Sequence, residues 1–501
     1  MEALQQLVKI VNRKRLSKID VFDKTFLNNT NSNIYQLLYE GLENGKITDD
    51  ASAAAYVYGS EEKDAKFRKL KQRFKNKLQK TVLLLDADDV FQSEKSRVYY
   101  ECVLTNHIIE IIIQLNGTTK LVYELVKENY SKAKQYNFYS ILKNYSYYLL
   151  SYYAINGEKK LFDKEQQLFL LYVDLAQKEQ LAKFLYFKSI ILFEELTPIT
   201  DELLNTVNKN LDELLKIKEE LKNIEVNFYY YFLALDFYQK SNQLDELIRI
   251  CNEADQLMDN NHAAYTNTRK TIVFLSRLYS ILTTRKYNEG INFIQSSEQI
   301  KIPIGNVNWF ILKEIEFKLF LQIDRLQEAY SVYEEVKKNK NFERQTQKTK
   351  ERWLIYHAYC VFMDNYINQG DYKYSLGRLL NEVQVNVKDK SGFNYALRII
   401  EILFNAARND FNLIFSKIDA LRVYRSRYLN DNTYKRNHLF LSLLIKAEKS
   451  GYNAKTMKEA KWPEIAELRK QNLYIIADWE IMPYERLWDI FVELSEKNKI
   501  K

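Results

Sequence analysis

A recurring anchor residue is the feature that most constrains how this chain folds. An apolar residue repeatedly follows a short polar turn and opens an amphipathic segment. The anchors are Phe162, Leu203, Leu244, Tyr287, Leu326, Tyr372 and Phe411, and their separations are 41, 41, 43, 39, 46 and 39 residues. One helix pair at this interval leaves an apolar face exposed, which the next pair covers. The spacing therefore predicts a stacked, superhelical array of antiparallel helix hairpins.

Glycine and proline are too scarce for most alternatives, with 11 and 4 occurrences in 501 residues. Tight β-hairpins and phosphate-binding loops depend on glycine for backbone angles that other residues avoid. The composition therefore predicts an all-α protein. Lys, Asn, Ile, Tyr and Phe are abundant, as expected of an AT-rich genome, and we expect a bacterial source. We interpret the 38 tyrosines mainly as half-buried helix-packing residues, with base stacking as the alternative.

The residues after two anchors carry a family resemblance. Tyr287-Asn-Glu-Gly290 and Leu326-Gln-Glu-Ala329 resemble the turn and second helix of the tetratricopeptide-repeat superfamily. The intervals here are longer than that family's 34 residues, and its closing proline is largely absent. The resemblance implies an α-solenoid that binds peptides or proteins. Because a fold of this kind serves many partners, it does not name the ligand.

We predict three regions along the chain. Residues 1–89 form an N-terminal helical module, residues 90–455 the repeats, and residues 456–501 capping helices with Trp462, Trp479 and Trp488. The module begins with an amphipathic helix near residues 2–16. Three further helices are expected at 34–43, 49–58 and 61–85, with Thr48 and Ser60 as caps and Gly59 at the end of the second.

The third of these helices contains the most concentrated charge. Residues 63–80 hold nine basic residues and one acid, and their net charge of +8 equals that of the whole chain. Phe67, Leu70 and Phe74 lie on one helical face, which predicts a buried stripe. The cations expected to point outward, and proposed to bind a partner or nucleic acid, are Lys66, Arg68, Lys69, Arg73, Lys75, Lys77 and Lys80.

Four interpretations of the basic segment stay open. Its cations can contact the phosphates of DNA or RNA, dock on an acidic protein, face solvent alone, or meet a membrane surface. Ala55 and Gly59 resemble a helix-turn-helix, although Arg68 stands where that motif has an aliphatic residue. Two further basic clusters are residues 337–352 and a group mixed with tyrosines. That group is Arg422, Tyr424, Arg425, Arg427, Tyr428, Tyr434, Lys435 and Arg436.

Catalytic and cofactor-binding patterns are missing. The chain has no Gly-rich nucleotide loop, no HExxH and no metal-finger spacing. His357 and Cys360, three residues apart, form at most half of a metal site or a thiol-imidazole pair, and we interpret them as packing residues. Likewise, Asp86, Asp88 and Asp89 are interpreted as a helix boundary and not as a cation site. We predict no enzyme activity, no cofactor and no metal.

Cellular location follows from the cysteines and the apolar runs. Cys102, Cys251 and Cys360 are far apart and odd in number, which favours a reduced, cytoplasmic protein. The most apolar run, residues 103–115, is shorter than the roughly 20 residues of a membrane span. The leading hypothesis is a non-enzymatic scaffold or adaptor that holds a protein partner in its superhelical groove. The alternative is a nucleic-acid-binding regulator that uses residues 63–80, with the repeats as sensor. The oligomeric state is left open.

Overall fold

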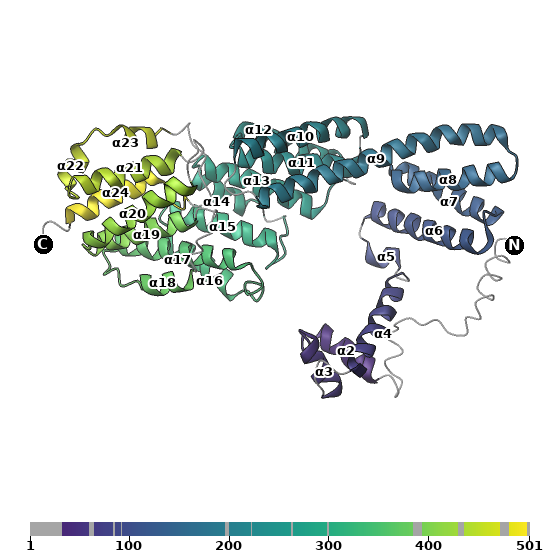
Figure 1. The fold of residues 1–501 in the computed structure, drawn as a ribbon, viewed down its shortest axis with the longest axis horizontal. Helices are drawn as coiled ribbons and strands as arrows, with labels where there is room; N and C mark the ends of the chain where they lie inside the picture. Colours follow the sequence, from purple (N-terminus) through teal and green to yellow (C-terminus); the bar gives the residue numbers. More distant parts are fainter. Residues whose placement is uncertain are drawn as a thin grey trace. The chain divides into compact units, whose positions relative to one another are not determined.

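The computed structural model is helical throughout the part of the chain that it describes. The described ranges are 33–59, 65–83, 86–91, 93–195, 200–221, 223–261, 264–297, 300–383, 393–428, 435–470 and 480–497. Over these ranges the chain has helices and no β-strand, and consecutive helices pack against one another (Figure 1), so the all-α prediction is confirmed. The predicted helix at 2–16, the Ser60 cap, Tyr434 and Trp479 lie outside the described residues.

Two compact units, residues 1–178 and 179–501, divide the chain within helix α9. The predicted boundaries at 89/90 and 455/456 are finer divisions and stay predictions. The helices of the first unit, up to its end within α9, are α2 Asn33–Glu43, α3 Asp50–Tyr58, α4 Ala65–Val82, α5 Ala87–Val90, α6 Glu94–Asn116, α7 Lys120–Gln135, α8 Tyr139–Ile155 and α9 Lys159–Glu195.

Helices α2, α3 and α4 enclose a small core of their own. Phe67, Leu70 and Phe74 of α4 are buried in it, as their spacing predicts, together with Leu38 of α2 and Ala54 of α3. The cap of α3 is Asp49, not the predicted Thr48. The Asp49 carboxylate accepts from the Ser52 N–H at 2.7 Å and the Ser52 hydroxyl accepts from the Asp49 N–H, a reciprocal arrangement that Thr48 does not make. Gly59 ends α3 at φ 61°, as expected.

Consecutive helices of the second unit are separated by at most 15 residues, and most of them pack on a sequence neighbour. These helices, after the end of α9, are α10 Asp201–Leu221, α11 Ile224–Lys240, α12 Leu244–Asn260, α13 Asn267–Thr283, α14 Tyr287–Gln295, α15 Val307–Gln322, α16 Leu326–Lys338, α17 Gln347–Ile367, α18 Leu376–Glu382, α19 Phe393–Ala407, α20 Phe411–Tyr428, α21 Lys435–Lys449, α22 Ala454–Glu459, α23 Pro463–Leu468 and α24 Tyr484–Lys497.

One turn geometry recurs between paired helices of this unit. In each case a non-glycine residue two positions before the second helix is left-handed, and the following N–H donates to a carbonyl near the end of the first helix. The left-handed residues are Asn242, Arg285, Asp324 and Asn409, with φ between 56° and 62°. The repeated conformation gives the successive helix pairs the same connection.

Four of the seven anchors stand directly after these turns. Leu244, Tyr287, Leu326 and Phe411 are the first residues of α12, α14, α16 and α20, so the sequence located these helix starts correctly. The other three differ. Tyr372 lies in the segment before the short helix α18 and is itself left-handed at φ 52°, while Phe162 and Leu203 lie within the first turn of α9 and α10.

Buried tyrosines join helices that are distant in sequence. The hydroxyls of Tyr145, Tyr359 and Tyr395 donate to the carbonyls of Cys102, Ala396 and Asn437, at 3.0, 3.0 and 2.8 Å. The donors lie 43, 37 and 42 residues from their acceptors, which is close to the anchor interval. These rings pack in the core and their hydroxyls satisfy backbone groups, the packing role predicted for tyrosine.

Candidate functional sites

The basic face of α4, defined as the seven predicted cations from Lys66 to Lys80, occupies helix surface outside the buried stripe. All seven are exposed except Lys77, which is half-buried with its ammonium 5.6 Å from the centre of the Tyr35 ring. The packing of Phe67 and Phe74 in the module core fixes this orientation. The structure therefore brings the predicted site residues together on one short helix.

Four of these seven cations have no ion-pair partner within the described residues. Arg68, Lys69, Arg73 and Lys75 form no ion pair with a carboxylate of the described residues. On the same helix, Lys71 pairs with Asp50 of α3. A cluster of like charges without counter-charges repels itself and attracts an anionic ligand.

The basic cluster at 337–352 has more acidic neighbours. Its cations Lys338, Lys350 and Arg352 pair with Glu334, Glu343 and Glu314, at 3.3, 2.8 and 2.9 Å. Ion pairs therefore compensate part of its charge, while the exposed Lys337, Lys340, Arg344 and Lys348 form no ion pair with a described carboxylate.

The cluster around residue 430 follows the same pattern where its side chains are described. Arg422 pairs with Glu448 at 2.9 Å and Lys435 with Glu467 at 2.7 Å, while Arg436 is buried against Glu480. The side chains of Tyr424, Arg425, Arg427 and Tyr428 lie outside the described residues. In both clusters, ion pairs engage some of the cations that the sequence left available for a ligand.

His357 and Cys360 contact different neighbours. The His357 ring stacks on Tyr333 at 4.5 Å between ring centres, and burial lowers its pKa. The Cys360 thiol donates to the carbonyl of Leu326, and burial raises its pKa to about 12. A thiol whose pKa is raised in this way is a poor nucleophile at neutral pH, and both side chains pack against residues of α16.

Asp86, the first of the acidic residues after α4, caps helix α5, and the side chain of Asp89 lies outside the described residues. The Asp86 carboxylate accepts from the Asp88 N–H at 3.0 Å at the start of α5, and Asp88 pairs with Arg97 at 3.2 Å. No group of three metal-ligating side chains exists among the described residues. Nor does any helix within the described ranges have the length and apolar character needed to cross a bilayer.

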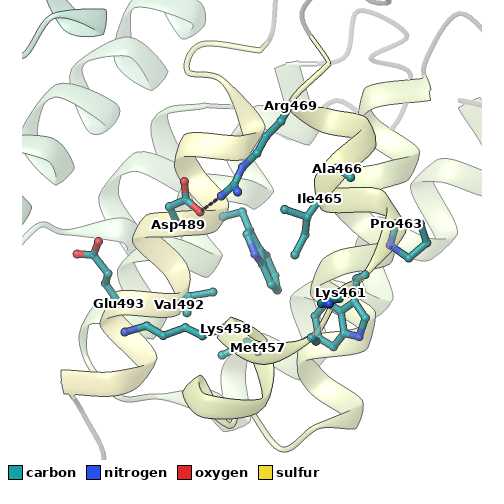
Figure 2. A pocket seen from close by; sticks show the side chains of 13 residues that line it. Met457, Lys458, Lys461, Pro463, Ile465, Ala466, Arg469, Asp489, Val492 and Glu493 are labelled. Atoms are coloured by element: carbon teal, nitrogen blue, oxygen red, sulfur yellow. Dashed lines mark hydrogen bonds and ion pairs between the residues drawn. The ribbon is translucent and has the colours of Figure 1, made fainter.

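A pocket of about 650 Å³ lies between α22, α23 and α24 (Figure 2). Its apolar walls are formed by Met457, Trp462, Ile465, Trp488 and Val492, and the two indole rings lie 5.8 Å apart. Charged residues line it too, namely Lys458, Lys461, Arg469, Asp489 and Glu493. Such a combination suits an apolar side chain with polar groups beside it.

Most of the charged groups at this pocket are held in place. Arg469 donates to Asp489 at 2.8 Å across the pocket, as Figure 2 shows, and Lys458 pairs with Glu496. Burial raises the pKa of Asp489 although Arg469 opposes the effect. Tyr366 of α17 donates to Glu493 at 2.5 Å. Lys461 is exposed and forms no ion pair with a described carboxylate.

A buried charge network positions α24, the wall that carries Trp488. Arg436 of α21 donates to both Glu480 oxygens and to Glu485, and the side chains of Arg436 and Glu480 are each 2% exposed. Burial would raise the pKa of Glu485, but Arg436 and Arg285 lower it. The paired charges fix the start of α24, since an unpaired charge at this depth would be costly.

The start of α24 is also bound by two of the recurring turns. Glu485 pairs with Arg285, and Arg486 pairs with Asp324 and donates to the Gln322 carbonyl at 3.0 Å. The left-handed turn residues Arg285 and Asp324 therefore link α24 to turns that lie 200 and 162 residues earlier, respectively. Helix α24 is therefore attached to the turns before α14 and α16, and not only to the helices just before it in the sequence.

No family model, curated protein or solved structure matches this chain. The resemblance to tetratricopeptide repeats therefore rests on the anchors and on the residues that follow them. The described residues form helices without strands, helices that are neighbours in sequence pack on one another, and one turn geometry recurs between them.

Sequence reasoning missed the pocket. Trp462, Pro463 and Trp488 indicated the capping region, but the spacing of 26 residues between the two tryptophans gives no hint that their rings meet. The available signal was three of the five tryptophans within residues 462–488 in a chain where the residue is otherwise rare. Tryptophan is enriched in binding pockets as well as in cores.

Proposed function

We propose that this protein is a non-enzymatic scaffold or adaptor of the cytoplasm, built as a tetratricopeptide-like superhelical array that binds a protein partner in its groove. The recurring turns before α12, α14, α16 and α20 support the repeat architecture. The packing roles of His357 and Cys360 support the absence of catalysis, because these were the strongest nucleophile and base candidates in the sequence.

The pocket between α22, α23 and α24 is the observation that carries this proposal. Partner side chains that dominate binding energy enter desolvated pockets lined by aromatic residues. The walls formed by Trp462, Ile465 and Val492 fit an apolar side chain of the partner, and the exposed Lys461 is proposed to contact a polar group beside it. The rest of the partner is proposed to lie in the groove of the repeats.

Filling the pocket tests the proposal. Ala466 lines the pocket and is exposed, so Ala466→Trp blocks it without removing a core side chain. Thr456→Trp places the same ring on exposed α22, outside the pocket lining, and serves as the control. Wild type and both variants are used as bait in quantitative affinity purification with nuclease treatment.

A protein retained by wild type and Thr456→Trp, and reduced at least tenfold by Ala466→Trp, would support the proposal once the purified pair binds directly. Equal retention by all three baits would remove the pocket from the binding site. Loss of every retained protein after nuclease treatment would favour a nucleic-acid function instead.

A second function, nucleic-acid binding by α4, is favoured by Arg68, Lys69, Arg73 and Lys75, which form no ion pair with a described carboxylate. Phosphate contacts by such side chains give affinity that falls steeply with salt. The test is fluorescence anisotropy of labelled duplex DNA and RNA with the full chain at several salt concentrations. Lys69→Gln/Lys75→Gln should weaken binding, whereas Lys209→Gln/Lys216→Gln, which removes two exposed lysines of α10, should leave it unchanged. Absence of binding at low salt would refute this function.

A further inference from the structure

The exposed polar side chains of α4 fall into three rows along the helix. At 100° per residue, each row occupies an arc of about 60° to 80°. The first cation row is Lys66, Lys69, Arg73, Lys77 and Lys80, the second cation row is Arg68, Lys71 and Lys75, and the amide row between them is Gln72, Asn76 and Gln79. The centre of the amide row is directly opposite the buried stripe of Phe67, Leu70 and Phe74.

The outermost strip of α4 is therefore neutral and both its flanks are positive. Gln72, Asn76 and Gln79 are exposed, and the Gln72 amide donates to the Asn76 carbonyl oxygen at 3.0 Å. Arg68 and Lys75 on one flank, and Lys69 and Arg73 on the other, lack ion pairs with described carboxylates. A ligand that matches this surface has two lines of negative charge separated by hydrogen-bonding groups.

We propose that α4 binds duplex DNA in the major groove, with the amide row facing the base edges and each cation row facing one phosphate backbone. This inference rests on the second proposed function. A helix with its side chains is about 10–12 Å across, and the B-DNA major groove is about 12 Å wide. Gln72 and Gln79 are seven positions apart, or roughly 10.5 Å along the helix axis, which corresponds to about three base pairs.

The chemistry of the amide row indicates which bases are read. The side-chain amide of Gln or Asn both donates and accepts, and it pairs with the N6 and N7 atoms of adenine. Breaking the bond between Gln72 and Asn76 frees both amides for this contact. We therefore expect preference for a site of about three base pairs that contains adenine.

Competing ligands fit this surface less well. The major groove of duplex RNA is too deep and narrow for side chains to read. A membrane surface needs an apolar face, but Phe67, Leu70 and Phe74 of α4 are buried in the module core. An acidic protein accounts for the cation rows but not for the amide row between them, whereas base edges in the major groove pair with side-chain amides.

Selection from a random 20-base-pair DNA library with the full chain, followed by anisotropy titration, tests the proposal. The amide variant Gln72→Ala/Asn76→Ala/Gln79→Ala changes exposed residues to a strong helix former, so the fold is retained. The charge variant is Lys69→Gln/Lys75→Gln, with Lys209→Gln/Lys216→Gln as its matched control. We expect wild type to prefer the selected site at least tenfold over a scrambled duplex.

Each outcome supports or overturns the inference. Support requires that the amide variant loses the preference to within twofold while its affinity for the scrambled duplex is unchanged. The charge variant must bind both duplexes more weakly and show a salt dependence smaller by about two phosphate contacts. If the amide variant keeps the preference, or duplex RNA or single strands bind better, this inference fails while nucleic-acid binding stands. If no nucleic acid binds at low salt, both fail.

Discussion

Glu314 of α15 is the carboxylate whose removal gives the clearest stability test. It is 17% exposed and lies among three donors. Arg352 of α17 donates to its Oε2 at 2.9 Å, Lys318 pairs with its Oε1 at 3.2 Å, and the Tyr356 hydroxyl donates to that oxygen at 2.7 Å. Burial would raise the pKa of Glu314, but Arg352, Lys318 and Tyr356 together lower it to about 2.

The size of the effect follows from this pKa. Relative to the ordinary value of 4.5, a pKa of about 2 corresponds to about 3 kcal/mol of stability at pH 7. Because the folded-state pKa is the lower one, this stability is complete above about pH 5 and is lost as the pH falls towards 2. At pH 3.5 about 2 kcal/mol is left. Glu314→Gln removes the charge and should cost these amounts.

Tryptophan fluorescence measures this loss in the second unit alone, since all five tryptophans lie between residues 309 and 488. Urea unfolding of wild type and Glu314→Gln is followed at pH 7 and pH 3.5. Glu246→Gln is the control, because Glu246 pairs with Arg249 on the surface, and it should cost less than about 1 kcal/mol at pH 7. If Glu314→Gln costs no more than the control, or its cost does not shrink in acid, the reasoning is wrong.

Two further predictions concern the turns and the thiols. Asn242 is left-handed at φ 56°, so Asn242→Gly should change stability by less than about 0.5 kcal/mol while Asn242→Val costs about 1–2 kcal/mol, both measured by urea unfolding followed by circular dichroism. Equal costs for the two variants would contradict the turn's role. Cys102, Cys251 and Cys360 are buried and free, and burial raises the pKa of each. A thiol reagent at pH 8 should therefore modify none of them rapidly in the folded protein and all three in urea; a rapidly reacting thiol in the folded chain would count against this burial.

The sequence allowed the helix starts to be placed wherever the local signal was strong. Leu244, Tyr287, Leu326 and Phe411 follow polar residues that adopt left-handed geometry, and helices begin at each of them. Tyr372 also follows a polar turn, but no helix begins there, because Tyr372 itself takes the left-handed conformation. Spacing identifies a turn, but it does not say which of several polar residues will occupy the left-handed position.

The candidate sites were predictable to different degrees. Helical periodicity located the basic face of α4, because both its buried stripe and its cations lie within one helix. The pocket at the C-terminal end needed contacts between residues of three helices, such as Trp462 with Trp488. The ion pairs of the other basic clusters could not be predicted either, since the Glu314 carboxylate that Arg352 contacts is 38 residues earlier and on another helix. Long-range contacts of this kind leave no local pattern in a single sequence.

The contrast between paired and unpaired cations bears on where function lies. In the second unit, Arg352, Arg422 and Arg436 each meet a carboxylate from another helix, so their charge contributes to packing between helices. The cations Arg68, Lys69, Arg73 and Lys75 form no ion pair with a described carboxylate of another helix, and none of them belongs to the hydrophobic core that α4 shares with α2 and α3. Their mutual repulsion opposes folding of the module, so a stabilising role does not explain them. An anionic ligand relieves that repulsion, and stability of the module should therefore rise when duplex DNA is added.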